Sequence, residues 1–416
     1  MRILHAARNP ANQAGYVVAA LRRLGHDAQL WEYEGNRFGF PADRVIDISS
    51  GDPAVFWRTF EDAIGRFDVL HFHFGRTFFP NDWGGVPPLW DLPIYRVLGK
   101  KVFHTWHGSD CRIRAVHLEV NPWSYYRTSD VGADDDRTRK VIEVFRTYAD
   151  RQFVVSPDYL AFVPDAQVMP RVIDLDEWPE QAPVQRAAPR LLHVPTRRGT
   201  KGSDVIIAGL ERLRAEGLAF DFTLLEGVSH DEARRAIQAA DVVIDNVITG
   251  DYEIVSLEAM ASSRVAVANI QGESARAFPD APVYSVDPST FEERMRALIV
   301  DQPARQALAA RGRAYVAARH DAPVIAAQLL EAYAAPSRPV ARQSFPDWLS
   351  LDAARSIERL ERRLADSQAR ELDLRRRLGM PVELADERTL KDRLPMPLRL
   401  RLRRARARLS GVLRRR

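Results

Sequence analysis

Short apolar runs alternate with amphipathic stretches along the first 178 residues of the chain. The apolar and β-branched runs predict short strands over residues 2–5, 28–31, 68–73, 101–104 and 152–155. Between the first two runs, residues 15–24 place Val17, Leu21 and Leu24 on one face of a predicted helix. Strands that are separated by helices pair in parallel through right-handed crossovers. The pattern therefore predicts a doubly wound α/β domain over residues 1–178.

The same alternation restarts after a segment, residues 179–189, that holds three prolines and has no apolar periodicity. This composition is typical of a linker between domains. Beyond it, strands are expected at 190–194, 221–225, 241–244 and 264–267, and helices at 202–218, 231–240 and 253–262. The predicted fold class is therefore α/β, with two Rossmann-like domains, 1–178 and 190–335, facing a cleft. Ligands of open α/β sheets bind where the strands reach their carboxyl ends.

The pattern changes after about residue 336. Six apolar residues fit a heptad seam within a predicted helical or coiled-coil segment, residues 349–380: Ala353, Ile357, Leu360, Leu364, Leu374 and Leu378. Self-association through residues 353–378 is one interpretation, and a single helix packed on the chain's own body is the other. The last segment, residues 397–416, interleaves leucine with arginine.

Composition and charge narrow the function classes. The chain has 416 residues, of which 46% are hydrophobic and 28% charged, as in ordinary globular proteins. The net charge of +4 is uneven, because residues 397–416 hold nine arginines and no acid, which leaves −5 for residues 1–396. That tail lacks aromatic residues, so stacking on nucleic acid is not expected. Near an anionic lipid surface each arginine contributes about 1 kcal/mol, which favours a membrane surface as a partner of the tail.

Other features predict where the protein works. The single cysteine, Cys111, cannot form an internal disulfide, which is typical of a reducing cytoplasm. The N-terminus does not resemble a signal peptide, and no apolar run approaches the length of a membrane span. We therefore expect a cytoplasmic protein that is peripheral on the inner face of the membrane if the basic tail binds lipid.

The stretch Thr249–Ala261, T-G-D-Y-E-I-V-S-L-E-A-M-A, carries the richest local signal. A turn leads into a helix whose first amides are expected to be unpaired and so to favour an anion. Glu258 follows among apolar residues, where a carboxylate needs hydrogen-bond donors such as sugar hydroxyls. The alternative is a surface glutamate on a good helix-forming sequence.

A second stretch, residues 195–202, lies between a predicted strand and a predicted helix. Its cations Arg198 and Lys201, with Gly202 allowing close approach of the backbone, suit a diphosphate. The spacing is not that of a Walker A loop. A solvated basic turn without function is the alternative.

The first domain offers a histidine and a glycine at expected loop positions. His107, Gly108, Ser109 and Asp110 end a predicted strand and can present an imidazole to the cleft. Gly15, in the loop predicted after the first strand, allows close approach of an acceptor or a phosphate, or simply punctuates a turn.

Two further groups in the first domain have simpler interpretations. His71, His73 and His104 lie near His107, but the usual spacing with carboxylates or cysteines is lacking, so no metal site is predicted. The acidic run at residues 134–136 precedes a helical pattern, where acids complement the helix dipole.

Together, residues 1–335 resemble the GT-B retaining glycosyltransferases known as glycosyltransferase family 4. The run from Arg198 to Gly202 is similar to the family's diphosphate-binding Arg/Lys pair, and Leu257–Ala261 to the end of its E-x7-E motif. His107–Asp110 is similar to its H-G-x-D segment. The resemblance implies that Glu258 holds the ribose of a nucleoside-diphosphate sugar and that Arg198 and Lys201 neutralise its diphosphate. It also implies that His107 and Asp110 lie beside the transferred sugar, and Gly15 near the acceptor.

One position departs from the family pattern. The first glutamate of E-x7-E falls on Gly250, and Asp251 or Glu253 is the nearest acid that can replace it. Some relatives carry a glycine–aromatic run such as Gly250-Asp251-Tyr252 here.

The resemblance implies retaining, metal-independent transfer of a hexose to a glycan or lipid-linked acceptor, in the biosynthesis of a cell-surface polysaccharide or glycolipid. It implies no cofactor beyond the sugar donor. The alternative is a non-catalytic GT-B scaffold that is recruited through its coiled coil and basic tail.

Overall fold

The computed structural model describes residues 1–33, 39–48, 52–79, 89–129, 134–182 and 186–340. Both the coiled-coil segment predicted at 349–380, with its seam at 353–378, and the basic tail at 397–416 lie outside these residues. Contacts divide the chain into two compact units. The first comprises residues 1–78 and 95–338, and the second comprises residues 79–94 and 339–416. The sheets and the candidate site belong to the first unit.

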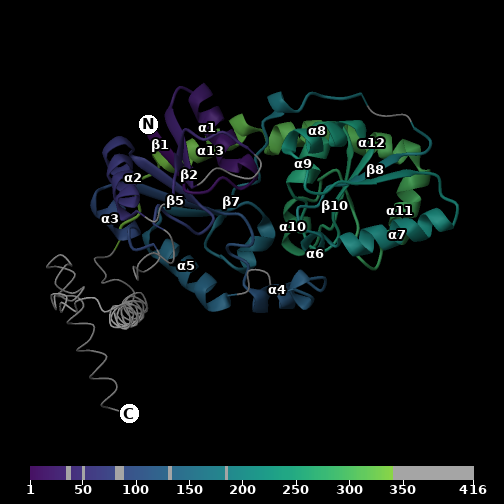
Figure 1. Cartoon of the computed structure of the whole chain (residues 1–416), viewed down its shortest axis with the longest axis horizontal. Helices are drawn as coiled ribbons and strands as arrows, with labels where there is room; N and C mark the ends of the chain where they lie inside the picture. The colour runs from purple at the N-terminus through teal and green to yellow at the C-terminus, as the bar shows by residue number, and fades with distance from the viewer. Residues whose placement is uncertain (34–38, 49–51, 80–88, 130–133, 183–185, 341–416) are drawn as a thin grey trace, which may run out of the picture. The chain divides into compact units, whose positions relative to one another are not determined.

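A seven-stranded parallel sheet forms the first lobe of this unit, in the order β3-β2-β1-β4-β5-β6-β7 (Figure 1). Its strands are β1 (Arg2–Ala6), β2 (Asp27–Tyr33), β3 (Arg44–Ile46), β4 (Val69–His73), β5 (Lys101–Trp106), β6 (Arg151–Val154) and β7 (Gln167–Val168). Every residue of the central β4 is buried. Burial on both faces explains why this strand is a continuous run without polar alternation.

The helices that connect these strands are α1 (Gln13–Arg23), α2 (Pro53–Arg66), α3 (Leu92–Val97), α4 (Arg114–Val120) and α5 (Asp135–Tyr148). Short 3-10 turns occur at Pro10–Asn12, Tyr125–Arg127, Pro157–Ala161 and Leu175–Glu177. The acidic run at 134–136 has the helix-start role predicted for it, since the Asp134 carboxylate accepts a hydrogen bond from the Arg137 amide at the start of α5.

The second lobe is built on a five-stranded parallel sheet in the order β12-β11-β10-β8-β9. Its strands are β8 (Arg190–His193), β9 (Asp221–Leu224), β10 (Val242–Asn246), β11 (Val265–Ala268) and β12 (Val283–Ser285). Its helices are α6 (Arg198–Lys201), α7 (Ser203–Ala215), α8 (His230–Ala239), α9 (Ile254–Ala261), α10 (Gly272–Ala277), α11 (Phe291–Val300) and α12 (Gln302–Arg319). The predicted α/β class with two parallel sheets is confirmed.

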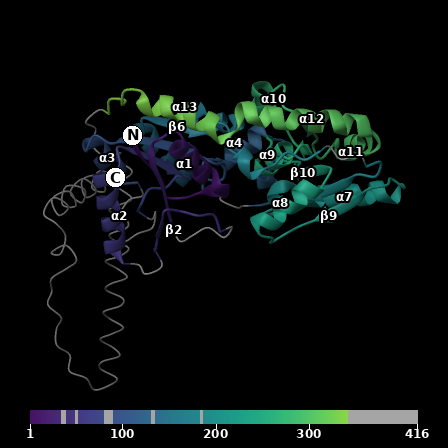
Figure 2. The same ribbon diagram turned by 90° about the horizontal axis from the view of Figure 1, so that it is seen from above.

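The last described helix, α13 (Ala322–Ala334), returns to the first lobe although its sequence lies within the predicted range 190–335. It lies beside α1 (Figure 2), and its Ile325, Leu329 and Tyr333 belong to the same buried cluster as Val17 and Leu21. Because α13 covers the first sheet, the two lobes are connected twice, once through residues 179–189 and once through this helix. In the part of the chain described here, no helix is both long and apolar enough to cross a bilayer.

Candidate functional site

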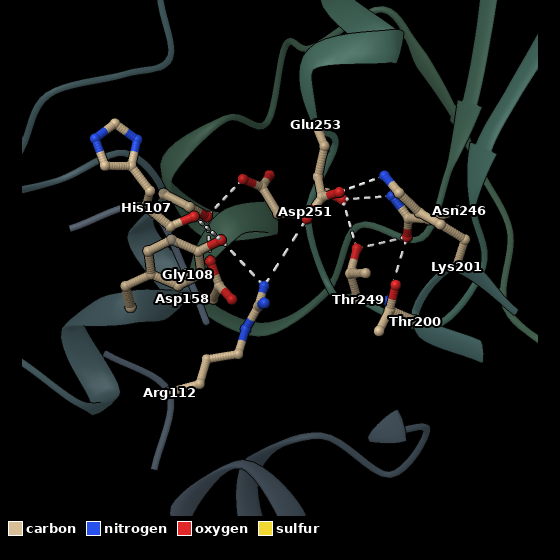
Figure 3. Close-up of polar contacts among 12 residues, drawn as sticks. His107, Gly108, Arg112, Asp158, Thr200, Lys201, Asn246, Thr249, Asp251 and Glu253 are labelled. Carbon is tan, nitrogen blue, oxygen red and sulfur yellow. Dashed lines mark hydrogen bonds and ion pairs between the residues drawn. The ribbon is translucent and has the colours of Figure 1, made fainter. Parts of the chain in front are cut away.

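Three segments singled out in the sequence lie at carboxyl ends of strands. His107–Asp110 follows β5, Lys201 lies between β8 and α7, and Gly250–Glu253 lies between β10 and α9. Figure 3 shows residues of these segments together with Arg112 and Asp158. Because the first segment belongs to one lobe and the other two to the second, the site is built from both sheets.

Asp110 shapes the turn after β5. Its Oδ1 atom accepts hydrogen bonds from the amides of His107 at 3.0 Å and Gly108 at 2.8 Å. Burial raises the pKa of the Asp110 carboxyl to about 6, while these amides act in the opposite direction. Gly108 has a φ of 131°, and a Cβ at this position would lie 2.7 Å from the Tyr159 hydroxyl. The carboxylate of Asp110 therefore holds the backbone from which the His107 imidazole projects.

Asp251 carries a buried ion pair between the lobes. Arg171 donates to its Oδ2 at 2.7 Å, and the Ser156 hydroxyl donates to the same oxygen at 2.5 Å. Both side chains of the ion pair are at most 6% exposed. Burial raises the pKa of Asp251 although Arg171 opposes the shift. The pairing connects the segment after β7 with the turn before α9.

Lys201 is buried between two carboxylates of its own lobe. Its Nζ atom donates to Asp245 Oδ1 at 2.7 Å and also to Glu253 Oε2. Burial alone would lower the pKa of Lys201, but the charges of Asp245 and Glu253 outweigh burial and raise it. Lys201 is therefore positively charged, and two acids already neutralise it.

Glu253 reaches cations of both lobes. Its Oε1 lies 3.9 Å from the Arg112 guanidinium of the first lobe, and its Oε2 accepts from Lys201 of the second (Figure 3). Burial would raise the pKa of Glu253, but Lys201, Arg171 and Arg112 lower it to about 2. An anionic group thus stands between a lysine and an arginine at the carboxyl edges of both sheets.

The two cations of the predicted diphosphate pair have different partners. Arg198, at the start of α6, donates to both carboxylate oxygens of Glu226, at 2.8 and 2.5 Å, on the surface of the second lobe. Gly202 separates α6 from α7 with a φ of 73°, and a Cβ there would lie 2.5 Å from a Val247 methyl group. The glycine is required by close packing at this bend.

The expectation of unpaired amides at the start of α9 is wrong for two residues. Asp245 Oδ2 accepts hydrogen bonds from the Glu253 amide at 2.9 Å and from the Ser256 amide at 3.2 Å. It also accepts from the Ser256 hydroxyl at 2.8 Å. A carboxylate from the end of β10 therefore occupies the position in which the sequence predicts a ligand anion, because the helix terminus attracts any nearby negative charge.

Glu258 is buried, so the alternative of a surface glutamate does not hold. Its Oε1 atom lies 3.0 Å from His230 Nε2, at the start of α8. Burial raises the pKa of Glu258, and the hydrogen bond that His230 donates to Glu258 raises the pKa of His230. The rings of Phe40 and Trp178 meet the His230 ring edge-on, with centroids 5.0 and 6.0 Å away. The carboxylate thus lies in a partly aromatic environment and is paired with His230.

Three predicted residues have mainly structural surroundings. The Tyr252 hydroxyl lies 2.9 Å from both the Tyr315 hydroxyl and His320 Nε2, within a buried cluster of the second lobe. Gly250 has a φ of 97°, a conformation that favours glycine. Gly15 lies in the first turn of α1 rather than in a loop, and a Cβ there would lie 2.1 Å from Asn12 Oδ1.

Several site residues gave no signal in the sequence. Arg112 and Arg171 both donate to the Tyr159 hydroxyl, at 3.0 and 3.2 Å. Asn121 Nδ2 donates to the carbonyl of Ile248 at 2.9 Å and so connects α4 with the segment before Gly250. These partners lie 12 to 127 residues apart in the chain and share no spacing motif, so no local sequence pattern indicates that they meet.

Comparisons with known proteins show similarity in structure only. No family model matches the chain, and no curated protein matches its sequence. Sucrose-phosphate synthase from Thermosynechococcus elongatus superposes with a TM-score of 0.56 at 15% identity, over 80% of this chain and 97% of that one. The catalytic domain of starch synthase IV from Arabidopsis thaliana, bound to ADP and acarbose, gives 0.52 at 12% identity, over 80% and 98%.

A third structure, WaaG, a glycosyltransferase involved in lipopolysaccharide biosynthesis, gives a TM-score of 0.50 at 14% identity, over 80% of this chain and all of that chain (100%). At such identities the likeness establishes the fold alone, and the chemistry has to be argued from the site residues. The chain therefore has the two-lobed fold of the GT-B glycosyltransferases.

Proposed function

We propose that the protein is a glycosyltransferase that moves a hexose from a nucleoside-diphosphate sugar to a glycan or lipid-linked acceptor with retention, as in glycosyltransferase family 4. The observation that carries the proposal is the anionic Glu253 carboxylate between Lys201 and Arg112. A diphosphate presents charge of the same sign to the same two cations and can replace that carboxylate. The fold supports the proposal, and one neighbour with this fold was solved with ADP.

In the proposed reaction, each lobe contributes to stabilising the departing diphosphate. Lys201 and Arg112 neutralise the charge that develops on the leaving group, so no resident metal is needed for that role. Glu258, paired with His230, accepts hydrogen bonds from the ribose hydroxyls. His107 and Asp110 stand beside the transferred sugar, and the acceptor attacks from the face that the diphosphate leaves.

A specific observation favours a second candidate function, a non-catalytic scaffold of the same fold. Gly250 replaces the first glutamate of the family motif, and its positive φ disfavours a glutamate. Lys201 is already neutralised by two carboxylates, so an incoming diphosphate has to displace one of them. In this candidate, residues 349–380 and the basic tail recruit partners.

The basic tail also supports a proposed location. Nine arginines and interleaved leucines in residues 397–416 favour attachment to the anionic inner face of the cell membrane. Such attachment would bring a cytoplasmic enzyme to a lipid-linked acceptor. Deletion of residues 397–416 should then abolish co-sedimentation with vesicles that contain anionic phospholipid.

Thermal unfolding of the full-length chain with a panel of nucleoside diphosphates and their sugar conjugates tests the proposed function. A donor at a hundred times its dissociation constant should stabilise the fold by about 2.7 kcal/mol. Glu258→Gln should weaken the response, whereas Glu211→Gln, on the exposed face of α7, should leave it unchanged. Transfer or hydrolysis of the stabilising donor excludes the scaffold. The absence of a response to every nucleotide excludes the donor site and supports the non-catalytic scaffold.

A further inference from the structure

Four histidine rings of the first lobe form a continuous chain of hydrogen bonds. His107 Nε2 lies 3.0 Å from His73 Nδ1, and His73 Nε2 lies 2.9 Å from His5 Nδ1. Beyond His5, the chain runs through the Tyr333 hydroxyl to His71. His5 Nε2 lies 3.2 Å from this hydroxyl, which lies 2.5 Å from His71 Nδ1. The chain ends at Thr105, whose Oγ1 is 2.7 Å from His71 Nε2.

The topology of the sheet explains why these residues meet. His5, His71 and Thr105 lie near the carboxyl ends of the adjacent strands β1, β4 and β5, and His5 pairs in register with His71. The rings of His71 and His73 stack at 4.8 Å, and those of His5 and His71 at 4.7 Å. Helix α13 supplies Tyr333 from the far end of the described chain.

The rings in the chain are neutral. His5, His71 and His73 are at most 3% exposed, whereas His107 is partly exposed. Burial lowers the pKa of all four, for His5 and His107 to about 3. The rings border a cavity of about 20 Å³, which has room for a single water molecule, and the three buried rings are shielded from bulk solvent.

Because the four rings are neutral, the hydrogen-bond chain can adopt only a few patterns. A neutral imidazole carries one proton and one lone pair, and a phenol or alcohol carries one proton. A phenol oxygen can accept two hydrogen bonds, but among the described residues only His5 and His71 are hydrogen-bond partners of Tyr333, and a buried hydroxyl proton without an acceptor is disfavoured. Tyr333 therefore also donates within the hydrogen-bond chain, and each of the five bonds receives one proton only if every interior group donates in the same direction. There are two such patterns. In one, all four histidines carry the proton on Nε2, and in the other all four carry it on Nδ1.

We infer that Tyr333 and Thr105 are positioning residues that set the tautomer of His107 through this chain. When the bonds run toward Thr105, His107 Nδ1 is a hydrogen-bond acceptor, and when they run toward His107, the same nitrogen is a donor. The direction of this hydrogen-bond chain therefore decides whether His107 Nδ1 binds a donor group or an acceptor group of a ligand. That a sugar is this ligand rests on the proposed function, whereas the order of the protons within the chain does not.

Long-range 1H–15N correlation spectra of the 15N-labelled, full-length protein test the inference, because they distinguish the two neutral tautomers from imidazolium. At pH 7.5 the four rings should be neutral and share one tautomer or one averaged ratio. Different tautomers among the four rings, or an imidazolium among them, would overturn the inference. The measurement needs no ligand, so it is independent of the proposed function.

Two substitutions give opposite signatures. Thr105→Val leaves His71 Nε2 without a partner, and since a buried donor without an acceptor is disfavoured, all four rings should carry the proton on Nδ1. Tyr333→Phe cuts the chain in the middle. His71 should then move its proton to Nε2 to bond Thr105, while His5, His73 and His107 carry theirs on Nδ1.

A matched control is available in the second lobe. Tyr315→Phe also removes a buried tyrosine hydroxyl, one that bonds Tyr252, and should leave the four tautomers unchanged. If His71 and His5 keep the same tautomer in Tyr333→Phe, the coupling through Tyr333 is disproved. Should Tyr333→Phe fail to fold, Thr105→Val alone decides: any ring of the four that remains protonated on Nε2 contradicts the inference.

Discussion

Glu253 illustrates how a single side chain changes the chemistry of the site. Its carboxylate is held by Lys201 of its own lobe and lies near Arg112 of the other, so the cations available to a diphosphate are already paired. Asp251, two residues earlier, is paired with Arg171 in the same way. At the residue scale, the site therefore binds anions, and the anions that it binds in this structure are carboxylates of the protein itself.

We predict that Glu253→Gln strengthens the binding of nucleoside diphosphates. Removing one negative charge near Lys201 and Arg112 removes a competitor for both cations, and the dissociation constants of ADP, UDP or GDP should fall by about tenfold, or about 1.4 kcal/mol. Isothermal titration calorimetry measures the change. Glu292→Gln is the matched control, because it frees Arg212 from an exposed ion pair of the second lobe instead. Weaker binding to Glu253→Gln would show that Glu253 itself contacts the ligand.

Gly250 gives a second prediction at this scale. A side chain at a φ of 97° is strained, so Gly250→Ala should lower the free energy of unfolding by about 1–2 kcal/mol. Gly199→Ala is the comparison, since its backbone lies in α6 without a positive φ and an added Cβ meets no atom within 4 Å. Urea denaturation of the two variants should separate them. Equal midpoints would contradict the backbone explanation for the glycine.

The turn before α9 shows how one element is organised by a neighbouring strand. Asp245, near the end of β10, caps the amides of Glu253 and Ser256 and also pairs with Lys201. The same carboxylate therefore fixes the start of α9 and the position of the buried lysine. At the element scale, the region proposed to bind the donor is a junction between β10, α6 and α9 that this carboxylate holds together.

Asp245→Ala should consequently cost far more than the loss of an ordinary helix cap. Breaking a buried ion pair costs about 3–5 kcal/mol, whereas a lost cap costs about 1 kcal/mol. Asp301→Ala provides the reference, because Asp301 caps the exposed start of α12 through the Ala304 amide. Chemical denaturation of both variants gives the comparison. Similar costs would mean that Asp245 acts as a cap alone.

For the whole molecule, burial of histidine is the prominent electrostatic feature. Eight of the ten histidines have a lowered pKa, chiefly because burial disfavours the imidazolium: His5, His71, His73, His104, His107, His117, His193 and His320. Four of them join Thr105 and Tyr333 in one chain. In the folded protein these histidines therefore stay neutral at mildly acidic pH, whereas in the unfolded chain they become protonated.

Stability should therefore be highest above pH 6.5 and should fall as the pH drops below that value. The unfolded chain binds protons near pH 6.5, while His5 and His107 in the folded state bind them only near pH 3, so each such histidine contributes up to about 1.4 kcal/mol per pH unit. Carboxyls with a raised pKa, such as Asp110 and Asp158 at about 6, oppose part of the loss.

Urea unfolding between pH 7.5 and 5.5, with calorimetric measurement of proton uptake, checks this expectation. Net uptake of protons on unfolding at pH 5.5 is the expected sign, and the effect of the histidines should vanish at pH 8.5. Constant or rising stability toward pH 5.5 would contradict the burial of neutral imidazoles.

The sequence by itself determined the fold class and the strand ends at which the candidate site residues lie. Apolar runs, helical periodicity and glycine or proline turns are local properties, and they predicted strands such as residues 68–73 almost to the residue. Local patterns also placed Lys201 and His107 just after predicted strands, at the carboxyl edges of the sheets, and Glu258 within the helix over residues 253–262.

The tertiary structure alone decided which groups meet. Arg171 and Asp251, 80 residues apart, pair across the lobes, and Tyr333 reaches His5 from 328 residues away. It also decided that Asp245 caps α9 and that Glu253 neutralises Lys201. Pairings of this kind depend on the order of the strands in the sheet and on the return of α13 to the first lobe, and no local pattern encodes either. The charges of the site residues are therefore set by the packed fold rather than by the sequence motifs.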